Sequence, residues 1–178
     1  MCALDVRPAI GTERLILRAP VAADAAAIAE LANDIRVAGN VARMPHPYAV
    51  KDAEAWLGSL ATRDPRAEAA FAVEHRQFGL VGVLGFHAKS GGGSELGYWF
   101  GHPFWGRGYA TEAVSAALRW AKGDWRKNVV WAGHFAGNRA SGQVLVKAGF
   151  LYTGDVEPIP CLARGGQVMA SRKMVWLA

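Results

Sequence analysis

Apolar residues recur with two different periods along the chain, and the change of period predicts where helices and strands lie. Between Ala53 and Leu60 they fall at i, i+3, i+4 and i+7, which places them on one face of a helix. Similar spacing predicts three further helices, at about Ala22–Ala32, Tyr109–Lys122 and Arg139–Ala148. Each of these helices would bury its apolar stripe against a neighbouring element.

Short apolar runs between turn residues predict the strands. They cover residues 15–18, 70–74, 80–87, 95–100, 129–133, 150–153 and about 168–176. The turn Arg76–Gly79 joins two of them as a hairpin, so that pair should be antiparallel. A proline-rich turn at Met44–Tyr48 and a glycine-rich loop at Ser90–Ser94 separate other segments.

The strands on either side of Tyr109–Lys122 are joined through that helix. Such a crossover makes its two strands parallel. Together with the hairpin, it predicts a mixed sheet with helices on its faces, an α/β (α+β) fold.

Composition is typical of one globular domain spanning residues 1–178, with 52% hydrophobic and 20% charged residues. No apolar run approaches the roughly 18 residues of a membrane span. Residues 1–18 lack the apolar stretch of a signal peptide. The two cysteines, Cys2 and Cys161, are not expected to form a structural disulfide, so we expect a cytoplasmic protein.

Positive charge is concentrated in one stretch of the chain. Residues 107–147 carry seven basic and two acidic residues, and the whole chain has a net charge of +5. This excess is typical of a site for an anionic ligand and equally of a solvated helix face. The basic residues are scattered and match no nucleic-acid module, so we expect no nucleic-acid partner.

The most informative segment is the loop Trp105–Thr111, which follows a strand and opens a helix. Gly106 and Gly108 allow close approach of the backbone to a ligand. The first amides of a helix have no internal partner, and the helix dipole favours an anion there. The loop therefore predicts a phosphate site, to which Arg107 would add a charged contact.

Three phosphate-binding motifs compete for this loop. A P-loop fails because no Lys-Ser or Lys-Thr follows the glycines. A dinucleotide fingerprint fits poorly because Thr111 stands at its third glycine and His134, not an acid, follows the next strand. In the third pattern, [Q/R]xxGx[G/A], Gly108 and Ala110 fit while Trp105 replaces the usual Gln or Arg. The loop alone leaves the choice open.

Three blocks of residues lie in and around the loop. They are Glu95-Leu-Gly-Tyr-Trp-Phe100, Trp105-Gly-Arg-Gly-Tyr-Ala-Thr-Glu-Ala113, and Asn138-Arg-Ala-Ser141 followed by Lys147-Ala-Gly-Phe150. Together these blocks resemble the GNAT superfamily of N-acetyltransferases. Thr12-Glu-Arg-Leu-Ile-Leu-Arg18, Pro47-Tyr48 and Asp52-Ala-Glu-Ala-Trp56 are similar to the branch that contains RimJ and RimL. The likeness spans residues 12–153, apart from Trp105 and from Ala49, where relatives usually have a capping Thr.

The resemblance implies how acetyl-CoA would bind. In that fold a mostly antiparallel sheet contains one parallel pair of strands that splay apart, with helices on both faces. The pantetheine arm would lie between the strands and pair with the backbone of Tyr98, Trp99 and Phe100. The pyrophosphate would meet the loop, and Asn138 would contact the arm unless it serves only as a helix N-cap. Cofactor-contacting residues would be Trp105, Gly106, Arg107, Gly108, Tyr109, Ala110, Thr111 and Ser141.

Two residues are candidates for acid–base chemistry. Glu95 is the first choice for the general base because relatives often place a catalytic glutamate on this strand; a solvated carboxylate is the alternative. Ser141, one turn beyond Asn138, is the candidate acid for the thiolate, against an ordinary helix serine. A backbone amide near Trp99 or Phe100 is the candidate oxyanion donor.

Other reactive side chains fit structural roles better. His87 and His134 each end a strand and are better explained as surface or structural residues than as proton relays. Cys161 has no marked base nearby, and no cluster has metal-ligand spacing, so we expect no metal. Trp56 and Trp120 are expected in the core.

Two functional classes remain open. The first is an N-acetyltransferase acting on a protein N-terminus or a small amine, with its acceptor chosen by the loops Arg36–Val50 and Asp155–Gly166. The second is a non-catalytic acetyl-CoA sensor. The expected partners are acetyl-CoA and an amine, without nucleic acid or membrane, and the sequence leaves a homodimer open.

Overall fold

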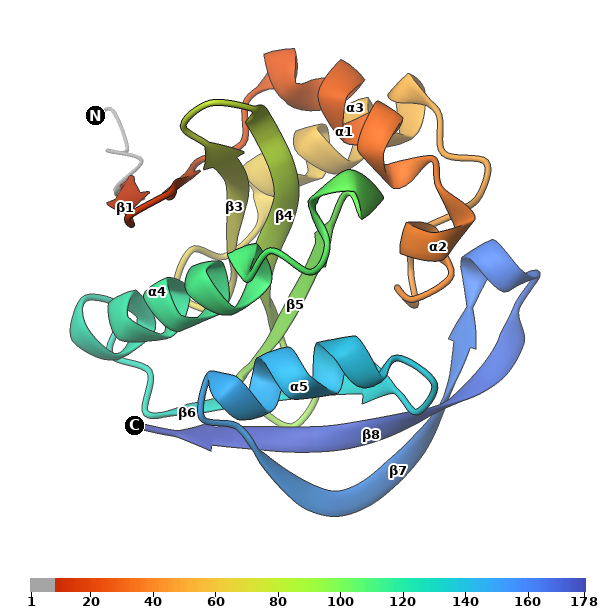
Figure 1. Ribbon diagram of the computed structural model, residues 1–178. Coiled ribbons are helices and arrows are strands. Elements are labelled where there is room, and N and C mark those ends of the chain that lie inside the picture. The colour runs from red at the N-terminus through yellow and green to blue at the C-terminus, as the bar shows by residue number, and fades with distance from the viewer. Residues whose placement is uncertain (1–8) are drawn as a thin grey trace.

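The computed structural model describes residues 9–178 and arranges them around one eight-stranded sheet. The strand order is β1-β2-β3-β4-β5-β6-β8-β7, and every neighbouring pair is antiparallel except β5 and β6 (Figure 1). The strands are β1 Ile10–Gly11, β2 Leu15–Arg18, β3 Ala69–His75, β4 Gly79–Ala88, β5 Ser94–Phe100, β6 Val129–Phe135, β7 Leu151–Cys161 and β8 Gln167–Leu177. This confirms the mixed sheet, the hairpin and the parallel crossover.

The helices cover both faces of the sheet. The α-helices are α1 Ala25–Ala32, α2 Ile35–Ala38, α3 Val50–Ser59, α4 Tyr109–Gly123 and α5 Arg139–Lys147. The 3₁₀ turns are η1 Ala22–Asp24, η2 Leu60–Thr62, η3 His102–Phe104 and η4 Leu162–Arg164. α4 and α5 lie side by side on one face, and α1 and α3 lie on the other (Figure 1). None of the helices in residues 9–178 combines the length and apolar character that a membrane span requires.

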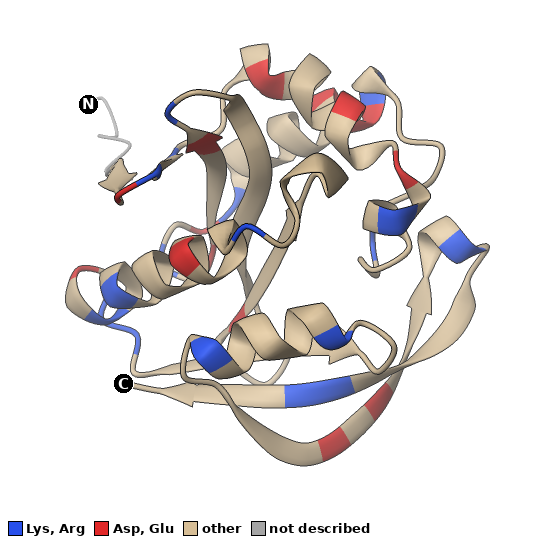
Figure 2. Cartoon of the chain, in the orientation of Figure 1, with Lys and Arg blue, Asp and Glu red and all other residues tan. Residues whose placement is uncertain are grey.

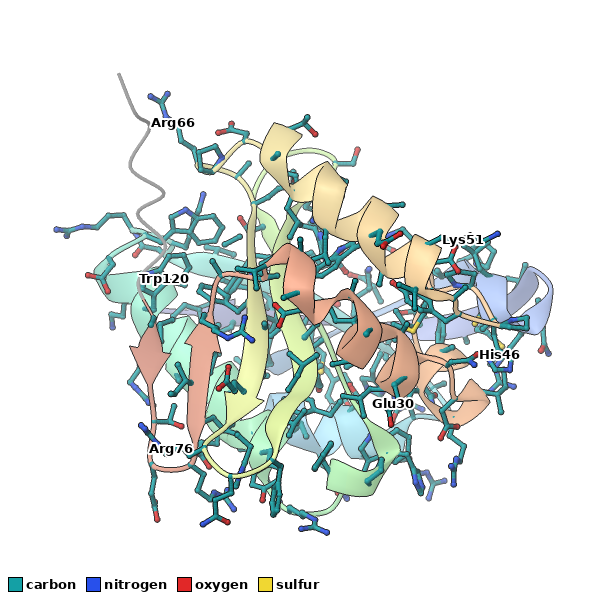
Figure 3. The ribbon with its side chains drawn as sticks, turned by 90° about the horizontal axis from the view of Figure 1, so that it is seen from above. Glu30, His46, Lys51, Arg66, Arg76 and Trp120 are labelled. Carbon is teal, nitrogen blue, oxygen red and sulfur yellow. The ribbon has the colours of Figure 1, made fainter. Side chains whose placement is uncertain are left out.

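Each face of the sheet has its own apolar cluster. The larger lies under α4 and α5 and contains Phe71, Phe86 and Trp120. The smaller lies under α1 and α3, where Trp56 packs against it. Figure 3 labels Trp120 at one end of the molecule and His46 at the other. Both tryptophans therefore have the packing role expected of them.

The parallel pair β5–β6 is short. Only Ser94, Glu95 and Leu96 of β5 pair with β6, although β5 continues to Phe100 and β6 to Phe135. From Gly97 onward β5 pairs only with β4. The two strands thus part on the side towards the start of α4, as the resemblance implied.

The last hairpin is longer than the sequence pattern predicts. Residues 155–161, expected in a loop, extend β7, and the hairpin closes through η4. Pro158 and Pro160 concealed this strand, because proline cannot donate a ladder hydrogen bond. β7 is an edge strand, where proline is tolerated, and the two prolines pair with Ala170 and Val168 of β8.

Candidate active site

The loop before α4 presents free backbone amides. Gly106 and Gly108 have φ of 74° and 80°, the left-handed region that favours glycine, and Gly108 is the N-cap of α4. The first helical bond runs from Glu112 N–H to Gly108 O, at 3.1 Å. Among the described residues, none accepts a hydrogen bond from the amides of residues 106–111. These amides can therefore bind an anion.

Glu112 ties this loop to β2. Its carboxylate accepts hydrogen bonds from Thr12 Oγ1 at 2.6 Å, from Arg14 N at 2.9 Å and from Arg14 Nε at 2.7 Å. Arg14 Nη1 also donates to the carbonyl of Arg107, at 2.9 Å. Burial alone would raise the pKa of Glu112, but the hydrogen bonds from Thr12 and Arg14 and the Arg14 charge lower it. The contacts fix the loop relative to the sheet.

Main-chain groups of β5 face the gap beyond Leu96. Gly101 N–H donates to Val81 O of β4 at 2.9 Å. Because successive residues of a strand alternate their hydrogen-bonding sides, Trp99 also turns its main chain towards β4, while Tyr98 and Phe100 turn theirs away. Of the three residues expected to pair with the pantetheine arm, Tyr98 and Phe100 have the suitable orientation. The indole of Trp99 packs under α1 and α3.

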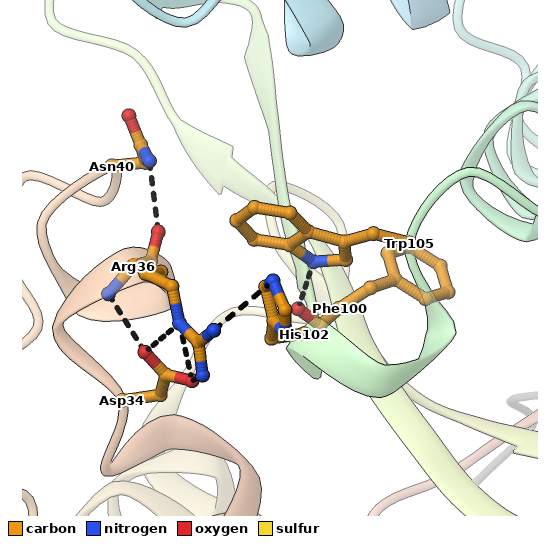
Figure 4. A network of polar contacts seen from close by, with 6 residues as sticks. All are labelled: Asp34, Arg36, Asn40, Phe100, His102 and Trp105. Atoms are coloured by element: carbon orange, nitrogen blue, oxygen red, sulfur yellow. Dashed lines mark hydrogen bonds and ion pairs between the residues drawn. The ribbon is translucent and has the colours of Figure 1, made fainter.

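Trp105 closes the end of β5. Its Nε1–H donates to Phe100 O at 2.7 Å, and its ring lies 5.0 Å from that of His102 (Figure 4). The indole therefore holds the end of β5 through the Phe100 carbonyl and leaves the Phe100 N–H free of this contact.

Ser141 joins α5 to β5. Its Oγ lies 2.8 Å from Tyr98 Oη, and its amide donates to Asn138 Oδ1 at 3.1 Å. Burial raises the pKa of Tyr98 to about 12, although its hydrogen bond to Ser141 lowers it, so the phenol stays protonated. Asn138 is thus an N-cap, with its side-chain oxygen engaged. The Ser141 and Tyr98 hydroxyls therefore form one hydrogen-bonded pair between α5 and β5.

Glu95 is held by a lysine. Lys173 Nζ lies 3.0 Å from Glu95 Oε1 and 3.1 Å from Glu157 Oε2. Figure 2 shows this basic part of β8 beside the acidic residues of β7. Burial lowers the pKa of Lys173, but the hydrogen bonds and charges of the two glutamates outweigh it and raise the value above 10.5. Sequence reasoning missed Lys173, because it lies 78 positions from Glu95 and carries no local signal.

The two sequence-predicted histidines have different surroundings. His134 is buried; its Nδ1 lies 2.9 Å from Phe135 O and its Nε2 2.9 Å from Tyr152 Oη. These contacts satisfy both ring nitrogens, as a structural histidine requires. His87 lies on the sheet face that carries Glu95, with its Nδ1 3.8 Å from Glu68 Oε1.

Cys161 is fully buried. Its Sγ lies 3.6 Å from Val41 O. Cys2 lies outside the described residues. Across residues 9–178, no group of three or more His, Cys, Asp or Glu is arranged to hold a metal ion.

The two segments expected to choose the acceptor meet each other. Leu162 N–H donates to Ala42 O at 3.0 Å, and Arg164 Nε–H donates to Gly39 O at 2.9 Å. Arg36, paired with Asp34, also approaches η3, with its Nη1 3.3 Å from His102 Nε2 (Figure 4). A hollow of about 450 Å³ lies between these parts of α1, α2 and η3. The first segment therefore borders η3, which follows β5, and the second segment contacts the first.

Comparison with known proteins identifies this architecture. Residues 14–151 match the family model described as an acetyltransferase (GNAT) domain. A comparison with curated protein sequences found no match.

Solved structures share the fold at low sequence identity. A GNAT-family acetyltransferase from Bacillus anthracis is 22% identical, with a TM-score of 0.80 over 96% of this chain and 98% of that one. Spermidine N-acetyltransferase from Vibrio cholerae, in complex with CoA and spermine, is 19% identical, with a TM-score of 0.76 over 93% and 96%. RimL, a ribosomal L7/L12 α-N-protein acetyltransferase in complex with coenzyme A, is 16% identical, with a TM-score of 0.79 over 96% and 98%. The family match over most of the chain, together with this fold, shows that the protein belongs to the GNAT family of acetyltransferases.

Proposed function

We propose that this protein transfers the acetyl group of acetyl-CoA to a primary amine by direct attack within a ternary complex. The observation that carries the proposal is the set of unpaired amides at the start of α4, beside the gap where β5 and β6 part. The amides suit a diphosphate, and the gap suits an extended pantetheine arm. Arg107, exposed in the same loop, adds positive charge at the diphosphate.

The transfer depends on aligning the amine with the thioester and needs no covalent enzyme intermediate. The amine nitrogen gives up a proton to a general base and attacks the acetyl carbonyl. A main-chain amide of β5 that faces the gap, that of Tyr98 or Phe100, donates to the oxyanion that forms. The carbon–sulfur bond then breaks, and Ser141, backed by Tyr98, protonates the thiolate. Glu95 and Lys173 lie on the opposite face of β5, where the amine would enter.

For the acceptor we propose a protein N-terminus or a small amine, in a cytoplasmic enzyme of the RimJ/RimL-like branch. The solved relatives named above act on spermidine and on a ribosomal protein, which supports an amine without choosing between the two. The contacts between residues 39–42 and 162–164 support acceptor selection by this region.

A panel of acceptors tests the proposal. Peptides with N-terminal alanine or serine, spermidine and aminoglycosides are each supplied with acetyl-CoA, and thiol release is followed. The wild type should turn over at least one acceptor, and Ser141→Ala should lower kcat while leaving the acetyl-CoA Kd within about threefold. Binding of acetyl-CoA without turnover of any amine would instead favour the sensor.

A further inference from the structure

The imidazole of His87 lies where β5 and β6 begin to part. His87 pairs with Glu95 across β4 and β5, and its ring leans along the strands over two glycines. A Cβ on Gly97 would lie 3.7 Å from His87 Nε2, and one on Gly85 would lie 3.8 Å from the same atom. Gly97 is the first residue of β5 beyond its ladder with β6. Because neither glycine carries a side chain, Nε2 is uncrowded at this point.

The position matches the reactive end of the bound cofactor. The proposed diphosphate site lies beyond Phe100, at the wide end of the gap, so an arm entering there runs towards its narrow end at Leu96. The thioester at the tip of the arm would then lie beside Gly97. His87 lies on the face of β5 that also carries Glu95 and Trp99, opposite the face where Tyr98 meets Ser141.

The surroundings of His87 favour a neutral ring. Burial and the charges of Arg43 and Arg63 lower its pKa, while Glu68 and Glu95 raise it by less, so the pKa lies below 6.5. Glu68 Oε1 lies 3.8 Å from Nδ1, which is too far for a hydrogen bond, but its negative charge favours the tautomer with the proton on Nδ1. The lone pair then lies on Nε2, on the side of Gly97.

Glu95 is less available for the same task. Its Oε1 accepts a hydrogen bond from Lys173 Nζ, which also contacts Glu157. This oxygen is therefore already engaged and is less free to meet an incoming amine.

We propose that His87 is the general base of the acetyl transfer, positioned by Glu68, and this inference rests on the proposed function. As the amine nitrogen forms its bond to the acetyl carbon, its proton passes to His87 Nε2. The carbon–sulfur bond breaks, and the coenzyme A thiolate takes a proton from the Ser141–Tyr98 pair. The products are the N-acetylated amine and the free thiol. His87 returns its proton to solvent, and the Ser141–Tyr98 pair regains a proton from solvent.

The test compares His87→Gln with the wild type, using whichever peptide or polyamine of the acceptor panel the wild type turns over. His87→Gln should lower kcat by about 10²–10⁴-fold at pH 7.5 and leave the acetyl-CoA Kd within about twofold. Added imidazole should restore at least about tenfold of the rate lost in His87→Ala. Lys89→Gln, two residues along the chain, is the matched control and should retain the wild-type kcat.

The pH dependence of kcat distinguishes a role of His87 and Glu68 in catalysis from a purely structural one. The wild-type kcat should fall on the acidic side of its pH profile at a pH below the ordinary imidazole value of 6.5, because a protonated imidazole accepts no proton. Glu68→Gln removes a charge that raises the pKa of His87, so this acidic limb should move to lower pH. A purely structural role of Glu68 would lower stability without moving the limb.

The outcomes distinguish the two proposals. A wild type that turns over no amine would overturn both. If the wild type is active and His87→Gln keeps its kcat and acidic limb, the role of His87 is overturned while the proposed function stands. The role of His87 is likewise overturned if Glu95→Gln, rather than His87→Gln, removes the limb.

Discussion

Gly108 shows how one residue sets the backbone conformation of the loop before α4. Its φ of 80° suits glycine, and a Cβ there would lie 3.4 Å from Arg14 Nη2. Gly108→Ala should therefore strain the turn by about 1 kcal/mol and misdirect the amides that follow. We expect its acetyl-CoA Kd to rise about tenfold, measured by isothermal titration calorimetry.

Gly58→Ala is the control for this change. Gly58 lies inside α3, has no positive φ, and has nothing within 4 Å of an added Cβ. It should stabilise the protein by about 0.5–1 kcal/mol and leave the Kd unchanged. Equal effects of the two substitutions on binding would contradict a special role for Gly108.

Ala49 is a second residue with a measurable effect. It is the N-cap of α3 and offers no side-chain acceptor, although its own N–H donates to Asp52 Oδ2 at 2.8 Å. Ala49→Thr should complete the reciprocal cap and raise the free energy of unfolding by about 1 kcal/mol, measured by urea unfolding. No gain would mean that Thr cannot adopt the capping rotamer there.

At the scale of elements, the link from β2 to α4 should respond to pH. The pKa of Glu112 is lowered in the folded protein, so its stabilising effect is present above the unfolded value of about 4.5 and is lost as pH falls through the folded pKa. Glu112→Gln should cost about 1 kcal/mol at pH 7, because Arg14 is 40% exposed and solvent weakens the pair.

Urea unfolding at several pH values measures this effect. The difference between wild type and Glu112→Gln should shrink as the pH falls towards 3. A difference that is independent of pH would show that the hydrogen bonds, and not the carboxylate charge, stabilise the loop.

Elements with strong local signals were predictable, and those without were not. The stripe from Ala53 to Leu60 predicted α3, and the crossover predicted the parallel pair, since period and connection are local properties. The extension of β7 was missed because Pro158 and Pro160 indicate a break until the strand is known to lie at an edge. The four-residue α2 was missed because it is too short to show a period.

In the candidate site, too, features with a local sequence signal were predictable and the others were not. The glycine turn and the start of α4 could be predicted because Gly108 and the helix are adjacent in sequence, while phosphate binding by this loop stays a prediction. The partners of its side chains could not, because Arg14 lies 98 positions from Glu112 and Tyr98 lies 43 positions from Ser141. Only the fold brings these pairs together.

At the scale of the whole molecule, cofactor binding should stabilise the folded state. A ligand at 100 times its Kd adds about 2.7 kcal/mol to the free energy of unfolding. Acetyl-CoA should therefore raise Tm by several degrees in a thermal melt, while NAD at the same concentration should not. A shift with NAD alone would favour the dinucleotide pattern instead.

The brevity of the β5–β6 ladder has a mechanical consequence. Three residue pairs form the whole ladder between the strands β1–β5 and the strands β6–β8, so few backbone hydrogen bonds join these two parts of the sheet. A ligand bound between the separated ends of β5 and β6 would link the two parts of the sheet, because it would contact the loop before α4 on one side and α5 on the other. Hydrogen exchange of the amides of β5 and β6 that face the gap should therefore slow together when the ligand is bound.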